Sequence, residues 1–400
     1  MKRILKRLVV LLLCTNSLIA QFSYQYKTSF VCNGISERPI SQLIESYAEK
    51  INEHLNYSIF FDRSFLKDAQ EVREYHCRPK ARREFIGQLY DVVTADGKHI
   101  GATFFDRGSD TLLVVAEGFT NAREVMSPFV AMFPQYDVVL FDFRGHGYQP
   151  GYWSDYVPCP SNVTKWFFGV DPDDVRFGCD EDKDVRAVVD AFKDLKKSTT
   201  GKRYANINGL GVCYGAFILL KTLSLNPGLF DRLVLDGCWL SLSLYIEKIE
   251  RDLKIMCNPQ EGGWSDHWFF SHEYTKQSID YIAKNFLFTI NDISLLDYVD
   301  RLGAEQILFF YGKDDYTITR DEFEQLWRAL PAHVRKTAII TSNPHVRNHL
   351  RQKELYKCVC DIFFSPFSHI ELEFCLNNPQ TFLEFFSNKL MRDCAPSVNQ

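Results

Sequence analysis

A cysteine between two glycines lies at the centre of segment 206–223, NINGLGVCYGAFILLKTL. A strand-like stretch precedes Cys213 and an apolar, helix-forming stretch follows it. At such a turn a nucleophile adopts a strained backbone conformation, and flanking glycines leave room for neighbouring chain. The first amides of the helix carry partial positive charge, which favours a thiolate. Cys213 is therefore a candidate nucleophile, and the alternative is inert packing of a small buried residue.

A thiol nucleophile needs a general base, and the base needs a group that orients it. Asp315 ends the strand-like stretch ILFFYGKDD, and His345 ends the stretch TAIITSNPH. Active residues of parallel sheets collect beyond the carboxyl ends of the strands. We therefore predict that Cys213, Asp315 and His345 serve as nucleophile, acid and base. The alternatives are that Asp315 only caps the following helix and that His345 is a solvated loop residue.

Other residues compete for the roles of acid and base. His349 lies one helical turn beyond His345, and His369 precedes the later segment NNPQTF. Asp314 and Asp236 also lie at strand ends and are alternatives for the acid. The sequence favours Asp315 and His345 as acid and base but leaves these alternatives open.

A tetrahedral intermediate at Cys213 would need backbone amides directed at its oxyanion. The amide of Tyr214, the next residue, is one candidate. The segment EGF places the amide of Phe119 in the loop after an earlier strand. Phe119 and Tyr214 are therefore the predicted oxyanion donors.

The elements that position these residues alternate between strand and helix from about residue 85. Three strands are predicted in 85–119, with turns at Asp-Gly and Gly-Ser pairs. An acidic start, a basic end and helical spacing of apolar residues predict a helix over 180–197. Further strands are predicted within the segments 136–147, 203–211, 230–239, 304–315 and 336–345. This alternation predicts an α/β fold with a mostly parallel sheet covered by helices on both faces.

Six motifs in order resemble the α/β-hydrolase fold superfamily over residues 87 to 363: VVAEGF, LFDFRGHGYQPG, GVCYGA, NPGLFDRLVLDG, ILFFYGKDD and NPHVRNHLRQKELYKCVCDIFF. The resemblance implies the same roles for Cys213, Asp315, His345, Phe119 and Tyr214. Most members have serine at the elbow, whereas dienelactone hydrolase and its relatives have cysteine.

Two further expectations come from comparing these motifs with the family pattern. The chain has Glu117-Gly118 where His-Gly is usual, which alters the expected oxyanion pocket. Asp142, Arg144 and His146 belong to a motif that mostly shapes a turn, and we predict structural roles for them.

The predicted organisation has four parts. Residues 1–20 form a signal peptide, 21–84 an N-terminal extension, 85–363 the hydrolase domain and 364–400 a C-terminal helical tail. An aromatic, largely helical cap is predicted at about 239–303, between two core strands.

Composition limits the partners and the compartment. The net charge of −5 without a long basic run argues against nucleic acid. No cofactor is called for, and no cysteine pair has the spacing of a metal site. Positive charge followed by LVVLLLCTNSLIA predicts export, to the periplasm or outside the cell. The alternatives are an uncleaved N-terminal membrane anchor and a cytosolic protein.

The cysteine count favours an oxidising compartment. Of the 12 cysteines, ten remain after Cys14 and Cys213 are set aside, which allows up to five disulfides. Proximity in sequence suggests pairs such as Cys159 with Cys179 and Cys238 with Cys257.

The leading hypothesis is an exported hydrolase that cleaves a small-molecule ester, thioester or lactone through Cys213. The main alternative is a catalytically inactive binding or structural protein on the same fold. A reactive thiol risks oxidation in an oxidising compartment, which favours the alternative. The acid and histidine at their strand ends favour the enzyme.

Overall fold

The structure is a computed structural model. Backbone and side chains are described within residues 87–119, 123–146, 175–244, 293–303, 305–313, 315, 317–343 and 345–365, and the backbone alone at 29–32, 38–39, 124 and 354.

The described strands form one ten-stranded sheet in the order β2-β1-β10-β9-β8-β7-β5-β6-β4-β3. Six neighbouring strands, from β10 to β6, run parallel, while β4 and β3 join antiparallel at one edge. The bounds of this part of the sheet are β3 (Gln88–Val93), β4 (His99–Phe105), β5 (Thr111–Ala116), β6 (Asp137–Phe141), β7 (Asn206–Val212), β8 (Arg232–Asp236), β9 (Gln306–Gly312) and β10 (Arg335–Thr341). The predicted α/β class with a mostly parallel sheet is confirmed.

Burial explains the runs of apolar residues in the central strands. Every residue of β6 is buried, as are nearly all of those in β5, since both faces of these strands are covered. Edge strand β3 instead alternates, with Leu89 and Val93 exposed and Val92 buried. A continuous apolar run therefore marks a central strand, whereas burial alternates in the edge strand.

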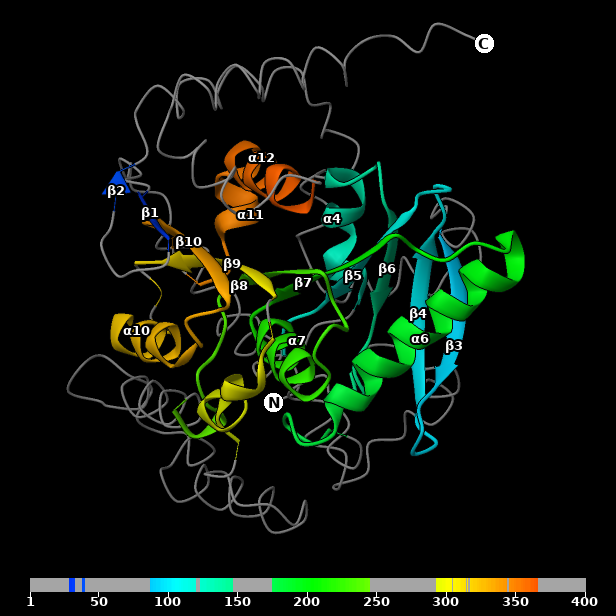
Figure 1. Cartoon of the computed structure of the whole chain (residues 1–400), viewed down its shortest axis with the longest axis horizontal. Coiled ribbons are helices and arrows are strands. Elements are labelled where there is room, and N and C mark those ends of the chain that lie inside the picture. The colour runs from blue at the N-terminus through cyan, green and yellow to red at the C-terminus, as the bar shows by residue number, and fades with distance from the viewer. Residues whose placement is uncertain are drawn as a thin grey trace, which may run out of the picture.

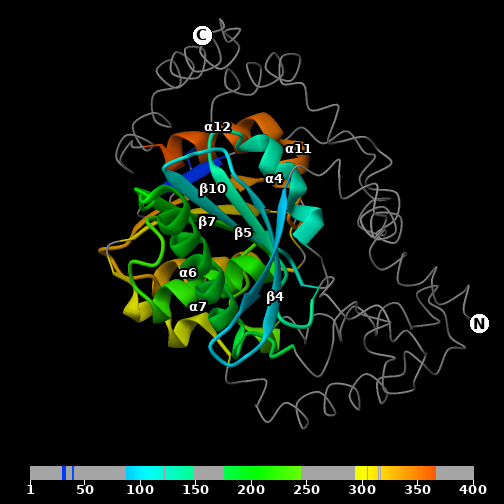
Figure 2. The ribbon, with the colours of Figure 1, turned by 90° about the vertical axis from the view of Figure 1, so that its right-hand side faces the viewer.

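Helices cover both faces of the sheet (Figures 1 and 2). On one face lie α6 (Glu181–Thr200), α7 (Tyr214–Leu225) and α10 (Arg320–Ala329), and on the other α4 (Ser127–Met132), α11 (Asn348–Arg351) and α12 (Lys353–Phe364). Each layer has its own buried apolar cluster, with Phe217 and Trp327 in the first and Phe129 and Val359 in the second. The sheet is thus the middle of three layers.

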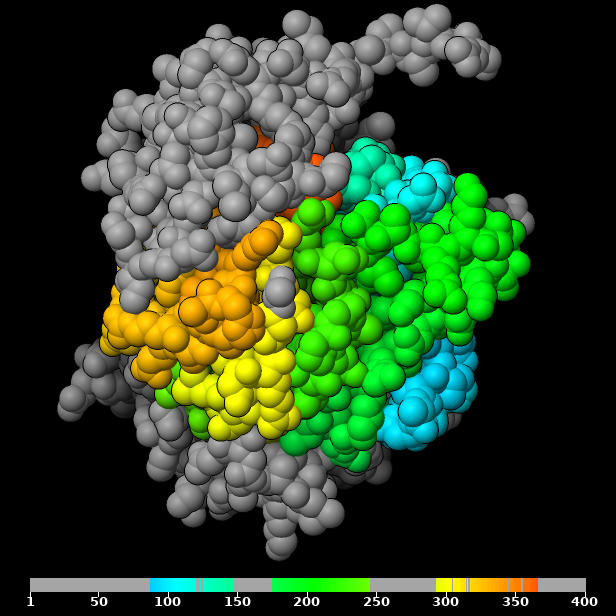
Figure 3. All heavy atoms as spheres, in the orientation of Figure 1, coloured from blue at the N-terminus to red at the C-terminus, as the bar shows by residue number. Residues whose placement is uncertain are grey.

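Three short 3-10 helices complete the described part: η5 (Arg123–Met126), η10 (Leu295–Asp297) and η11 (Val299–Arg301). The segment holding η10 and η11 lies beside α7. The space-filling view shows this segment (yellow) in contact with the α6–α7 region (green) and the β9–α10 region (orange) (Figure 3). The chain therefore packs against the core at η10 and η11 directly before β9.

The N-terminal extension contributes a feature that sequence patterns did not indicate. Strand β1 (Ser29–Cys32) pairs antiparallel with β10, and β2 (Arg38–Pro39) pairs with β1. Strand β10 is therefore not an edge of the sheet.

Several predictions fall outside the described residues and stay predictions. These are the signal peptide at 1–20, most of the cap at 239–303 and nearly all of the tail at 364–400. No helix within the described ranges is both long and apolar enough to span a membrane.

Disulfide formation gains no support from the described cysteines. The thiols of four are free: Cys179, Cys213, Cys238 and Cys360. The suggested partners of two of them, Cys159 and Cys257, lie outside the described residues.

Candidate active site

Cys213 occupies the sharp turn between β7 and α7. Its backbone has φ 55° and ψ −114°, a conformation that side chains other than glycine rarely adopt. Its N–H donates to the carbonyl oxygen of Asp236 at 2.8 Å, which ties the turn to the end of neighbouring strand β8. The strain is thus held by the sheet, as expected at a nucleophile elbow.

The two glycines of the elbow permit close approach of backbone. A Cβ on Gly211 would lie 2.6 Å from the Cα of Ala216, and a Cβ on Gly215 would lie 2.5 Å from the carbonyl oxygens of Ala116 and Glu117. Neither position can hold a larger residue without moving α7. The Gly-x-Cys-x-Gly pattern therefore has a steric origin, and it seats the start of α7 against the end of β5.

Asp315 lies in the loop between β9 and α10. Its Oδ1 accepts the backbone N–H groups of Thr317 and Ile318 at 2.8 and 2.9 Å. Thr319 and Glu322 then form a capping box that starts α10. These bonds fix one carboxylate oxygen in the loop and leave Oδ2 to face His345.

His345 lies between β10 and α11, and its Nδ1 donates to Asp315 Oδ2 at 2.7 Å. The Asp315 side chain is 1% exposed and the His345 side chain 13%. The next residue, Val346, has φ 46°, which is rare for a β-branched side chain. The loop is therefore held in a strained conformation that presents the imidazole to the carboxylate.

The electrostatic environment favours the protonated imidazole. Burial lowers the pKa of His345, but the charges of Asp315 and Cys213 and hydrogen bonds to both raise it well above its ordinary value. The buried Nε2 has no nitrogen or oxygen partner among the described residues. The arrangement is that of a thiol next to a base whose far nitrogen is held by a carboxylate.

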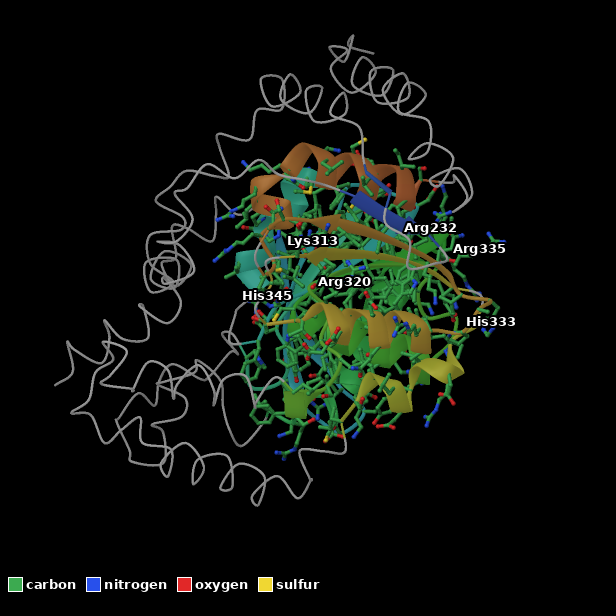
Figure 4. All side chains as sticks on the ribbon, turned by 90° about the vertical axis from the view of Figure 1, so that its left-hand side faces the viewer. Arg232, Lys313, Arg320, His333, Arg335 and His345 are labelled. Atoms are coloured by element: carbon green, nitrogen blue, oxygen red, sulfur yellow. The ribbon has the colours of Figure 1, made fainter. Side chains whose placement is uncertain are left out.

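Cys213, Asp315 and His345 all follow the carboxyl ends of parallel strands. His345 lies beside Lys313, at the carboxyl ends of β10 and β9, whereas Arg232 and Arg335 lie at the opposite ends of the strands (Figure 4). The structure thus places Cys213, Asp315 and His345 at the same ends of the strands. The sequence predicted this only because each residue follows a predicted parallel strand.

The predicted oxyanion residues also meet at this edge. Tyr214 begins α7 directly after Cys213, and Phe119 follows β5. Their rings lie edge to face with centroids 5.4 Å apart, and Phe119 also contacts Phe177 at 5.6 Å. The side chains of the two predicted oxyanion residues therefore pack against each other beside the elbow.

Glu117 replaces the usual histidine before this loop and is fully buried. Its Oε1 accepts the backbone N–H of Phe143 at 3.4 Å, which links the ends of β5 and β6. The unusual residue thus joins two loops beside the site.

The motif after β6 makes structural contacts, as predicted. Asp142 accepts the backbone N–H of Arg123 at 2.7 Å and pairs with its guanidinium. Arg144 is 1% exposed and binds Asp184 at 2.6 Å and Asp96 at 2.8 Å. These ion pairs hold the turn against α6 and the β3–β4 hairpin.

His146 completes the same turn. It is 1% exposed, its Nδ1 lies 3.2 Å from the carbonyl oxygen of Arg144, and its ring stacks on Tyr214 at 5.6 Å. Burial lowers its pKa to about 4, so the imidazole is neutral near pH 7. His146 therefore acts as an aromatic packing residue behind Tyr214.

The alternatives for acid and base separate in space. Asp236 is fully buried and accepts Nδ2 of Asn348 at 2.8 Å, and His349 Nδ1 lies 3.7 Å from its other oxygen. His349 packs on Phe129 in the layer of α4 and α12. Asp236 and His349 thus form a separate pair, while Asp314 and His369 lie outside the described residues.

Two neighbours of the Cys213 thiol were not predicted from the sequence. The indole Nε1–H of Trp239 donates to Cys213 Sγ at 3.2 Å. The Cys238 thiol is buried, and burial together with the charge of Cys213 raises its pKa. Both follow β8, whose end lies beside the elbow because β7 and β8 pair in register.

No cluster of three or more metal-binding side chains occurs within the described part of the chain.

Comparison with solved structures agrees with this architecture. Three crystal forms of an esterase from Pyrococcus furiosus are similar to this chain, with TM-scores of 0.52, 0.51 and 0.51 and identities of 20%, 19% and 18%. Each match covers 72% of this chain and 92%, 94% and 92% of the esterase chains. The chain has the α/β-hydrolase fold. No protein-family model and no curated protein matches the sequence.

Proposed function

We propose that this protein is a hydrolase that cleaves ester, thioester or lactone bonds with Cys213 as nucleophile. One observation carries the proposal: Cys213 occupies a strained elbow at the sheet edge that also holds the 2.7 Å pair of His345 and Asp315. An inert cysteine at this turn would need neither the strain nor a buried Asp-His pair beside it.

In the first half of the reaction, Cys213 Sγ attacks the carbonyl carbon and its proton passes to His345 Nε2. The amides of Phe119 and Tyr214 hold the oxyanion of the tetrahedral intermediate. The intermediate then collapses, and His345 gives its proton to the departing alcohol or thiol. Asp315 holds the imidazole in the required tautomer throughout.

In the second half, water attacks the thioester formed on Cys213 while His345 Nε2 accepts its proton. The second tetrahedral intermediate releases the acid and returns the thiol. A thiol suits acyl groups with good leaving groups better than plain amides, so we place esters and thioesters before peptides.

The test is turnover of p-nitrophenyl acetate by the purified full chain, compared with the variants Cys213→Ala and Cys213→Ser. We expect turnover in the wild type and none above background in Cys213→Ala. Circular dichroism of both variants controls for folding. Equal rates in all three proteins, or stoichiometric labelling without turnover, would leave a binding protein on a hydrolase scaffold.

A further inference from the structure

A tryptophan side chain donates directly to the sulfur of the candidate nucleophile. The distance from Trp239 Nε1 to Cys213 Sγ is 3.2 Å, and the two residues are 26 positions apart in the sequence. The contact joins the loop after β8 to the elbow after β7. An indole nitrogen is a donor only, so the sulfur is the acceptor.

The loop after β8 is built to hold this indole in place. Gly237 has φ 68°, and a Cβ there would lie 2.8 Å from Val346 Cγ1. The glycine lets the chain pass against the loop of His345 and then turn toward the elbow. Both loops are thereby fixed relative to each other.

Aromatic packing fixes the indole itself. Trp239 is 3% exposed, and its ring lies 5.4 Å from that of Tyr214, 6.2 Å from that of Phe217 and 6.4 Å from that of Phe119. The N–H is therefore oriented before any substrate binds, and it pays little entropy to reach the sulfur.

We propose that Trp239 is a catalytic residue whose indole N–H stabilises the thiolate of Cys213. The proposal deepens the proposed function and rests on it. A hydrogen bond to the charged form of a group favours that form, and bonds to ionised acceptors are stronger than bonds to neutral ones. With the indole on one side of the sulfur, the thiol proton passes to His345 Nε2 on the other, giving a thiolate–imidazolium pair.

The titratable groups that face the sulfur support this assignment. His345, with Asp315 behind it, approaches from the loop after β10. Cys238 approaches from β8, and since burial raises its pKa it stays a neutral thiol that does not repel the thiolate. The indole N–H of Trp239 supplies an uncharged donor to the same sulfur.

The same bond matters again when the acyl group leaves. Sulfur in a thioester is a poor acceptor, so the indole bond is lost in the acyl-enzyme and regained as the thiolate departs. Loss of the N–H is therefore expected to slow release of the acyl group, and acyl-enzyme is expected to accumulate.

The experiment measures alkylation of Cys213 by iodoacetamide against pH, followed by mass of the Cys213 peptide. The Trp239→Phe variant keeps an aromatic ring and removes the donor. We expect its alkylation midpoint to rise by about one pH unit and its rate at pH 7 to fall about threefold to tenfold. The matched control is Trp327→Phe, which is expected to behave as wild type. Trp327 is a buried tryptophan on α10 whose ring centroid lies 5.9 Å from that of Phe309.

An unchanged alkylation midpoint in folded Trp239→Phe would overturn the proposal. A second measurement needs no substitution at Trp239: alkylation of Cys213 should shift one of the six indole N–H resonances of the wild type, and absence of any shift would also overturn it. Alkylation does not require turnover. If the wild type lacks esterase activity but the alkylation midpoint still rises in Trp239→Phe, the proposed reaction is wrong and the role of Trp239 stands.

Discussion

His345 and His349 lie four residues apart, yet they belong to different layers of the molecule. His345 faces the elbow and Asp315, whereas His349 packs on Phe129 beside Asp236. A base must reach the proton that it abstracts, so geometry decides between them before pKa does. The structure therefore places the two histidines in different environments. Their closeness in the sequence could not show which of them faces Cys213.

This separation gives a prediction for matched variants. We expect His345→Gln to lower kcat/KM for p-nitrophenyl acetate by about 10²- to 10⁴-fold, since the general base is lost. His349→Gln is expected to stay within a few-fold of wild type once thermal unfolding shows that it is folded. Retained activity in His345→Gln with lost activity in His349→Gln would reverse the assignment.

At the scale of elements, the junction of β5, β7 and α7 positions Cys213. The helix begins so close to the end of β5 that only glycine fits at position 215. Because the clash would be with backbone carbonyl oxygens, a flexible side chain cannot move aside to relieve it. The whole start of α7 would have to shift.

The corresponding prediction concerns Gly215→Ala. We expect overpacking to cost about 1–3 kcal/mol of unfolding free energy, although alanine loses less conformational entropy than glycine on folding. Turnover should fall because the elbow and the Tyr214 amide move together. Urea unfolding and turnover of Gly303→Ala provide the control, since a Cβ there meets the Glu305 carboxylate at 3.1 Å, the end of a flexible side chain. Equal stability of the two variants would contradict the steric argument.

At the scale of the whole molecule, burial of His146 makes stability depend on pH. Its pKa is lowered from 6.5 to about 4 by burial. The unfolded chain therefore binds a proton in this window that the folded chain does not. The stability that His146 contributes is present above pH 6.5 and is lost as the pH falls toward 4.

His146→Phe removes this titration and keeps a ring beside Tyr214. We expect the stability of wild type relative to the variant, from urea unfolding, to fall by about 3 kcal/mol between pH 7 and pH 4. His99→Phe is the control, because the His99 side chain is 57% exposed. A difference that stays constant with pH would contradict the prediction.

The sequence by itself determined the order of strands and helices and the residues at the strand ends. These features are local: apolar runs mark buried strands, acidic and basic ends mark α6, and glycines around Cys213 mark the elbow. Strand order in a parallel sheet then predicts that the ends meet at one edge. Cys213, Asp315 and His345 could be selected on that basis.

Only the tertiary structure decided which side chains touch. Three contacts join distant parts of the chain. His345 pairs with Asp315 rather than with Asp236, Trp239 contacts Cys213, and strand β1 lies beside β10. No periodicity or spacing encodes such contacts, because they depend on loop conformations such as Gly237 and Val346 at positive φ. Packing of the three layers fixes those loops, and packing is a property of the folded molecule.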